Sequence, residues 1–170
     1  MTKNGKPTIV LEGADCAGKT TLARQIKNAW KLPYIHVLKA PEGMDVLVHQ
    51  LSAIKNLPAV IDRLHWSEEI YVNLLREQPM NDRDFGVVDG FLLAHKAIII
   101  HCSPPLRVLL ENVRKNPNGD NHTVDFQTRV WNEYNKTPRT VLPIVKYDFT
   151  VNNLQKILTK IETIVGCYYG

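Results

Sequence analysis

The sequence has 170 residues, of which 44% are apolar and 22% are charged, and its net charge is +4. This length suffices for one hydrophobic core and is short for two ordinary domains, so we expect a single domain over residues 1–170. No apolar run approaches the roughly 18 residues of a membrane helix, and the apolar stretch in MTKNGKPTIVLEG is too short for a secretory signal. We therefore expect a cytoplasmic protein with no membrane partner.

Apolar runs rich in β-branched residues alternate with segments of helical spacing. The runs predict strands over 8–13, 34–39, 58–63, 97–102 and 146–151. The other segments predict helices over 18–30, 44–56, 66–77, 105–115, 124–136 and 153–165. Apolar strands separated by helices are typical of a parallel sheet covered on both faces. The sequence therefore predicts an α/β fold with a five-stranded parallel sheet, whose strands end along one ligand-binding edge.

The segment from Gly13 to Thr20, GADCAGKT, fits the pattern G-x-x-x-x-G-K-[ST] and lies between a predicted strand and a predicted helix. Glycines let such a loop wrap its backbone N–H groups around a polyphosphate, and the helix N-terminus adds partial positive charge. Lys19 would reach the β and γ phosphates, and the Thr20 hydroxyl would bind Mg²⁺. The motif predicts a three-layer P-loop NTPase fold with ATP and Mg²⁺ as cofactors. The expected nucleotide-binding residues are Gly13, Ala14, Asp15, Cys16, Ala17, Gly18, Lys19, Thr20 and Thr21.

Among P-loop proteins, the sequence favours a small kinase. A GTPase would carry an NKxD motif, whereas NKTP at 135–138 lacks the Asp. A motor or a helicase would normally need a longer chain. The remaining class transfers a phosphoryl group to a small acceptor.

The third predicted strand ends in Asp62 and Arg63, which would lie beside the P-loop if that strand neighbours the first. Phosphoryl transfer needs cations to neutralise the moving charge and a carboxylate to orient Mg²⁺ or the nucleophile. We therefore expect Asp62 to be a metal ligand and Arg63 a catalytic cation; a surface ion pair is the alternative. Asp89 is a rival carboxylate, but Gly90 and the preceding polar run favour a turn entering a helix there.

Asp15 is an unusual residue inside a phosphate-binding loop, because its charge would repel a polyphosphate. A side chain that points away from the phosphates would face the acceptor and could accept a hydrogen bond from a sugar hydroxyl. The alternative is a solvent-facing Asp that stabilises the turn.

EGADCAGKTTL together with the strand-end DR resembles the thymidylate kinase family, whose pattern is EG.D.AGK[ST]T followed by DR[YFH] and an aromatic residue nine positions after that Asp. Tyr71 stands nine residues after Asp62. The resemblance implies that Asp15 meets the deoxyribose 3′-hydroxyl, that Arg63 bridges the donor and acceptor phosphates, and that Tyr71 helps to exclude a 2′-hydroxyl. It also implies dTMP as the acceptor and a homodimer formed through helices beside the sheet.

The segment DRLHWSEEIY is most similar to short bacteriophage members of this family, which show DR.H..E..Y. This likeness implies a location in the host cytoplasm and adds His65 and Glu68 to the residues expected to face the acceptor. Trp66 adjoins them and is a candidate for stacking on the base. A structural hydrogen bond for His65 and ordinary packing for Trp66 are the alternatives.

Turn residues cluster near 79–84 and at 116–121. The second cluster lies between two predicted helices and is either a lid over the phosphate site, at about 114–124, or a simple helix-to-helix turn. Lid-type kinases need a cation over the transferring phosphate, but residues 116–123 contain no Arg. Arg114 is the candidate for this catalytic role.

The cysteines Cys16, Cys102 and Cys167 have neither disulfide nor zinc-site spacing, so reduced thiols are expected. Cys16 would be a small filler in the P-loop or, beside a helix N-terminus, a reactive thiol. The Lys and Arg residues are scattered along the sequence, which favours an anionic small molecule as the ligand. This distribution does not indicate a nucleic-acid-binding surface and does not exclude one.

These observations predict an enzyme that phosphorylates a deoxynucleoside 5′-monophosphate, with dTMP favoured, at the expense of ATP. One alternative is a kinase for a hydroxyl of a deoxynucleoside, or of a modified base or an end in DNA, for which Asp62 or Glu68 would be the general base. The other alternative is a non-catalytic nucleotide-binding protein.

Overall fold

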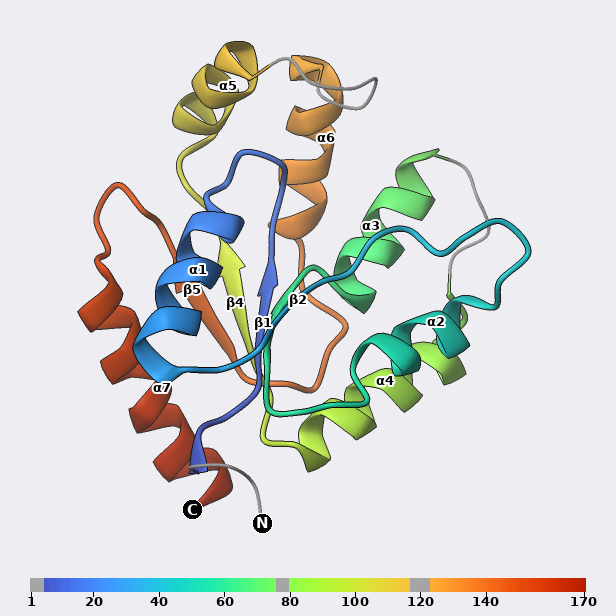
Figure 1. Ribbon diagram of the computed structural model, residues 1–170. Coiled ribbons are helices and arrows are strands. Elements are labelled where there is room, and N and C mark those ends of the chain that lie inside the picture. The colour runs from blue at the N-terminus through green and yellow to red at the C-terminus, as the bar shows by residue number, and fades with distance from the viewer. Residues whose placement is uncertain (1–4, 76–79, 117–122) are drawn as a thin grey trace.

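The computed structural model describes residues 5–75, 80–116 and 123–170. They form a five-stranded, all-parallel sheet flanked by seven helices, which confirms the predicted α/β fold (Figure 1). The strands are β1 (Ile9–Glu12), β2 (Tyr34–His36), β3 (Val60–Asp62), β4 (Ile98–Cys102) and β5 (Ile144–Tyr147). The helices are α1 (Lys19–Trp30), α2 (Val46–Ala53), α3 (His65–Leu75), α4 (Asp82–Ala94), α5 (Leu106–Lys115), α6 (Val124–Tyr134) and α7 (Leu154–Tyr169).

The strand order is β2-β3-β1-β4-β5, so the P-loop strand β1 is central. On one side Leu11 is in register with Asp62 of β3, and on the other Glu12 is in register with His101 of β4. The chain therefore proceeds to opposite sides of β1, which creates the switch point where ligands bind in sheets of this kind. This order confirms that β3 neighbours β1, the condition on which the expected place of Asp62 depended.

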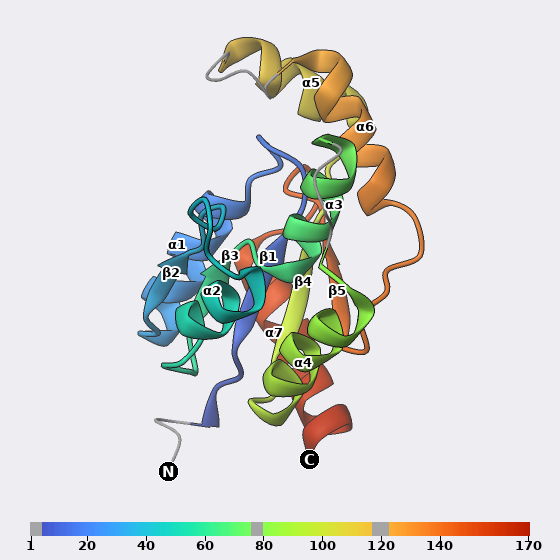
Figure 2. The ribbon, with the colours of Figure 1, turned by 90° about the vertical axis from the view of Figure 1, so that its right-hand side faces the viewer.

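Helices cover both faces of the sheet. Helices α1 and α7 pack against each other on one face, while α2 packs with α4 and α3 packs with α6 on the other (Figures 1 and 2). Helix α5 packs against α6 and lies beyond the carboxyl ends of the strands, above the P-loop (Figure 2). The loops that follow β1, β3 and β4 consequently meet under the α5–α6 pair.

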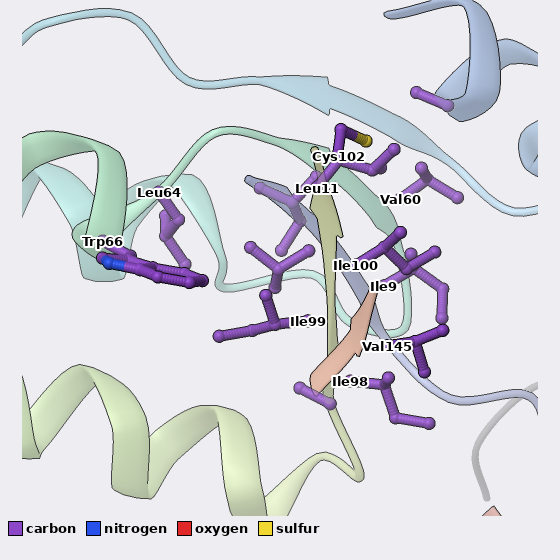
Figure 3. Packing of buried hydrophobic residues seen from close by; sticks show 14 of the residues in the cluster. Ile9, Leu11, Val60, Leu64, Trp66, Ile98, Ile99, Ile100, Cys102 and Val145 are labelled. Atoms are coloured by element: carbon purple, nitrogen blue, oxygen red, sulfur yellow. The ribbon is translucent and has the colours of Figure 1, made fainter. Parts of the chain in front are cut away.

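The core lies on both sides of the central strands. Figure 3 shows Ile99 on the side of β4 where Leu64 and Trp66 lie, with Ile98 and Ile100 on the opposite side. Every residue of β1, β3 and β4 is buried. Burial on both faces explains why these strands are continuous apolar runs in the sequence.

Several bounds differ from the sequence prediction; for example, β2 ends at His36 and not at 39, and α2 ends at Ala53 and not at 56. Helix α4 was not predicted, since Gly86 and Gly90 in its interior mask a buried stripe of Phe85, Val88 and Leu92. Strand β5 was predicted over 146–151 but spans Ile144–Tyr147, because the residues after it turn. Most of the predicted lid, residues 117–122, lies outside the described part of the chain. Among the described helices, none has the length and apolarity that crossing a membrane requires.

Candidate functional site

The P-loop connects β1 to α1, and its two motif glycines are required by its backbone. Gly13 has φ 145°, and a Cβ there would lie 2.4 Å from the carbonyl oxygen of Cys102 at the end of β4. Gly18 has φ 85° and precedes the first turn of α1, where a Cβ would lie 3.1 Å from the Phe149 ring. The 2.4 Å approach to a backbone oxygen requires glycine at position 13, and the positive φ together with the tight contact to the Phe149 ring favours glycine at position 18.

Lys19 folds back across the loop. Its ammonium donates hydrogen bonds to the carbonyl oxygens of Gly13 at 2.8 Å and Ala14 at 2.6 Å, and the residue is buried. The charge is therefore held inside the curve of the loop, where it is available to phosphate oxygens, which are stronger acceptors than carbonyl groups.

Asp62 joins three elements at the carboxyl edge of the sheet. Its Oδ2 accepts hydrogen bonds from the hydroxyls of Thr20 at 2.8 Å and Tyr34 at 2.9 Å, and His36 Nδ1 lies 3.6 Å from it. Burial, followed by the hydrogen bond to Asp62, raises the pKa of Tyr34 to about 12. The Tyr34 hydroxyl consequently keeps its proton and remains a donor.

Thr20 and Asp62 fit a Mg²⁺ ion. Asp62 is completely buried, and its Oδ1 has no hydrogen-bond partner among the described residues. Mg²⁺ prefers hard oxygen ligands and usually combines one or two carboxylates with waters and substrate phosphates. An unpartnered carboxylate oxygen beside a hydroxyl at the start of the P-loop helix matches this preference.

Asp15 connects the P-loop to Arg63 and to α6. Its Oδ1 forms an ion pair with the Arg63 guanidinium. Its Oδ2 accepts a hydrogen bond from Gln127 Nε2 at 3.0 Å, and its backbone N–H donates to Gln127 Oε1 at 2.9 Å. The Arg63 guanidinium also lies 5.0 Å from the centre of the Tyr71 ring. Asp15 therefore links the P-loop to Arg63 and to α6, in addition to placing a carboxylate at the site.

These groups surround one cavity of about 670 Å³ at the carboxyl edge of the sheet. Of the predicted nucleotide-binding residues, those from Asp15 to Thr21 line it, while Gly13 and Ala14 lie behind Lys19. The other lining residues are His36, Asp62, Arg63, Asn112, Asn116, Tyr147 and Phe149. The cavity therefore combines two cationic side chains, Lys19 and Arg63, with two carboxylates and an aromatic wall.

Two of the residues expected to face an acceptor lie in the interior instead. His65 is completely buried, with Nε2 2.7 Å from Asp89 Oδ1. Trp66 is 4% exposed, and its ring centroid lies 5.3 Å from that of His101 and 5.2 Å from that of Tyr134. The first turn of α3 packs onto the sheet, which turns both side chains inward. His65 thus makes a structural hydrogen bond and Trp66 packs in the core, which were the alternative expectations for these two residues.

Glu68 and Tyr71 are half-buried on the same helix. Neither is among the described residues that line the cavity, but the Tyr71 ring contacts Arg63, which does line it.

The rival carboxylate Asp89 lies within α4, where it is a structural group. It accepts hydrogen bonds from the Thr140 hydroxyl at 2.7 Å and from the Val141 backbone N–H at 2.8 Å. Burial opposes its ionisation, but His65, Thr140 and Val141 together lower the pKa of Asp89 below its usual value. Asp62, rather than Asp89, stands beside the P-loop.

Arg114 is exposed and is not brought to the cavity by the described structure. Asn112 of α5 and Asn116, which follows the last residue of this helix, line the cavity. At roughly 100° per residue, a side chain two positions after Asn112 points to the opposite side of the helix.

Sequence reasoning missed several polar residues around the site, among them the cavity-lining Asn112 and Asn116. Tyr34 and His36 contact Asp62 because β2 adjoins β3, with His36 in register with Asp62. Gln127 contacts Asp15 from α6, and Glu12 accepts hydrogen bonds beneath the P-loop. The only sequence signal was that Tyr34 and Glu12 lie near the ends of predicted strands; His36 lies inside the predicted strand 34–39, although β2 ends at this residue.

No protein-family model matches the sequence, and no curated protein does. Solved structures do match it over nearly its full length. The YorR protein from Bacillus subtilis, in complex with phosphorylated GDP, has 18% identity and a TM-score of 0.76, over 95% of this chain and 97% of that one. Deoxyadenosine kinase from M. mycoides, with the products dCMP and dCDP, has 15% identity and a TM-score of 0.63, over 92% and 99%. Thymidylate kinase from Candida albicans has 16% identity and a TM-score of 0.56, over 95% and 91%. The chain therefore has the fold of P-loop nucleoside and nucleotide kinases.

Proposed function

We propose that this protein is a kinase that transfers the γ-phosphoryl group of ATP to a deoxynucleoside 5′-monophosphate, with dTMP as the favoured acceptor. The observation that carries the proposal is the hydrogen bond from Thr20 to Asp62 in a cavity that also contains Lys19 and Arg63. A metal-binding pair and two cations around one P-loop are the parts that phosphoryl transfer requires.

Each of these residues has a distinct part in the proposed reaction. The P-loop backbone and Lys19 hold the donor phosphates, and Arg63 stabilises the charge on the transferring group. Thr20 and Asp62 are the residues that would hold Mg²⁺, which when bound neutralises charge on the donor phosphates. An acceptor phosphate is already a nucleophile, so the protein needs to position it rather than deprotonate it.

The proposed acceptor lies on the Arg63 side of the cavity. Asp15 and Arg63 are paired there, next to Tyr71, which supports their expected contacts with the sugar and the acceptor phosphate. The bound ligands of similar structures, phosphorylated GDP in one and dCMP with dCDP in another, support a nucleotide as the substrate class.

A second candidate is transfer to a hydroxyl, and the position of His36 favours it. His36 lines the cavity with Nδ1 3.6 Å from the buried carboxylate of Asp62. An imidazole beside a carboxylate can accept the proton that a hydroxyl nucleophile must lose.

An ADP-release assay with ATP and Mg²⁺ separates these candidates. The acceptors are the four deoxynucleoside monophosphates, thymidine and duplex DNA, and Lys19→Ala gives the blank. Turnover with a monophosphate that disappears in Lys19→Ala supports the proposal. Turnover only with thymidine or DNA would support the hydroxyl kinase, and ATP binding without any product would support the non-catalytic alternative.

A further inference from the structure

Glu12, the last residue of β1, has a completely buried side chain. Its carboxylate accepts hydrogen bonds from the backbone N–H of Leu64 at 3.0 Å, from the Tyr134 hydroxyl at 3.1 Å and from the Ser67 hydroxyl. Glu12 is not among the described residues that line the cavity. Its three donors come from the turn after β3, from α3 and from α6, so one carboxylate connects all three segments to the P-loop strand.

One of these segments carries Arg63, whose backbone is left-handed with φ 69°. This conformation is unfavourable for a residue with a Cβ and persists only where its surroundings hold it. The Arg63 N–H donates to the Leu11 carbonyl oxygen at 3.0 Å, and the next N–H, of Leu64, donates to Glu12. The last two residues of β1 thus hold the turn from which the Arg63 side chain enters the cavity.

The Arg63 side chain depends on negative and polar neighbours, since it is only 20% exposed. Burial opposes its charge, whereas Tyr71, Tyr134 and Glu12 outweigh that cost and raise the pKa of Arg63 above its usual value. Asp15 contacts the guanidinium at the cavity side. Glu12 therefore supports Arg63 through both the backbone turn and the charge.

We propose that Glu12 is a positioning residue for Arg63: its buried carboxylate fixes the turn after β3 against the P-loop and keeps the guanidinium at the transferring phosphate. The inference rests on the proposed kinase function and adds a residue to its machinery that does not touch the nucleotide. Removal of the Glu12 charge should therefore lower kcat by displacing Arg63 and should leave the binding of ATP unchanged.

The test is Glu12→Gln, which keeps the side-chain shape and removes the charge, made alone and together with Arg63→Ala. We expect Glu12→Gln to lower kcat by about 10- to 100-fold, as for other supporting groups behind an active site, with little change in KM for ATP. The loss should vanish in the Arg63→Ala background, since residues that act through one another are not additive. Asp89→Asn is the matched control, because it neutralises another buried carboxylate and should lower stability without changing kcat.

A spectroscopic measurement makes the test independent of turnover. The Arg63 Nε–H signal in ¹H–¹⁵N spectra, identified by its loss in Arg63→Lys, should shift in Glu12→Gln and stay in place in Asp89→Asn. If Glu12→Gln does not fold, Tyr134→Phe removes one donor to Glu12 and should give smaller changes of the same kind.

The outcomes separate the two proposals. No turnover by the wild-type protein on any acceptor would contradict the kinase function, and the Arg63 signal would still decide the role of Glu12. An unchanged signal, full activity of Glu12→Gln, or an equal loss with and without Arg63 would each overturn the positioning role.

Discussion

Thr20 Oγ1 lies 2.8 Å from Asp62 Oδ2, so the first turn of the P-loop helix is hydrogen-bonded to the end of the neighbouring strand. Both groups lie at the cavity. In the proposed reaction, Mg²⁺ would be held by these two residues, where the start of α1 meets the end of β3.

Asp62→Asn tests this link. Asparagine keeps the shape of Asp62 and removes the negative charge that attracts Mg²⁺, so we expect kcat to fall at least about 100-fold. The measurement is kcat as a function of Mg²⁺ concentration, with nucleotide binding compared in Mg²⁺ and in EDTA. Wild-type Mg²⁺ dependence in the variant would rule out Asp62 as the metal ligand.

Arg63→Ala should lower kcat by about 1000-fold or more, because an arginine at a transferring phosphate contributes on that scale. Arg107→Ala is the control, since Arg107 lies on α5, is 81% exposed and pairs only with Glu111 among the described contacts. Steady-state kinetics of both variants give the comparison. Equal activities would show that the position of Arg63 in the cavity is not used in catalysis.

The two glycines Gly13 and Gly86 should respond in opposite directions to alanine. In Gly13→Ala the new Cβ would meet the Cys102 carbonyl oxygen at 2.4 Å, and the backbone is left-handed, so we expect a loss of more than about 2 kcal/mol in the free energy of unfolding. Gly86→Ala lies in α4 with nothing within 4 Å of its Cβ and should gain about 0.5–1 kcal/mol. Urea unfolding measures both. Equal changes would contradict the role given to Gly13.

Stability should fall between pH 7 and pH 5 because of His101. Burial, followed by the charge of Lys146, lowers the pKa of His101 from 6.5 to about 4. The unfolded chain then binds more protons than the folded protein between these values, so the neutral imidazole contributes stability above pH 6.5 that is lost as the pH falls towards 4. We expect a loss of about 2 kcal/mol from pH 7 to pH 5 that is absent in His101→Phe. Identical pH dependence in that variant, measured by urea unfolding, would assign the effect elsewhere.

The three cysteines should react in a fixed order. Burial raises the pKa of Cys16, and raises that of the completely buried Cys102 to about 12, whereas Cys167 is exposed. Since the thiolate is the reactive form, iodoacetamide at pH 7 should modify Cys167 first, Cys16 slowly and Cys102 only on unfolding. Peptide mass mapping gives the order, and ATP should protect Cys16 because it lines the cavity. Rapid modification of Cys16 would show an activated thiol.

The strands and the P-loop were predictable from the sequence because each depends on local pattern. Strands buried on both faces are continuous apolar runs, and the loop is defined by glycines whose backbone angles other residues rarely adopt. The order of the strands was not predicted. The expected place of Asp62 beside the P-loop depended on the third strand being the neighbour of the first, and β3 does lie beside β1.

The direction of side chains was not predictable in the same way. His65 and Trp66 are residue types found in many sites, but the packing of α3 turns them into the core. Asn112 and Asn116, rather than Arg114, face the cavity because of the rotation of α5. The pairing of Asp15 with Gln127 joins residues 112 positions apart, which no local pattern reveals.

The most direct test of the proposed function is to follow the labelled γ-phosphate of ATP into product. The protein is incubated with γ-³²P-labelled ATP, Mg²⁺ and each deoxynucleoside monophosphate, with thymidine and Lys19→Ala as controls, and the products are separated by chromatography. The account predicts label in a deoxynucleoside diphosphate, most rapidly dTDP, and none with Lys19→Ala. Label only in dTMP formed from thymidine, or no labelled product at all, would contradict it.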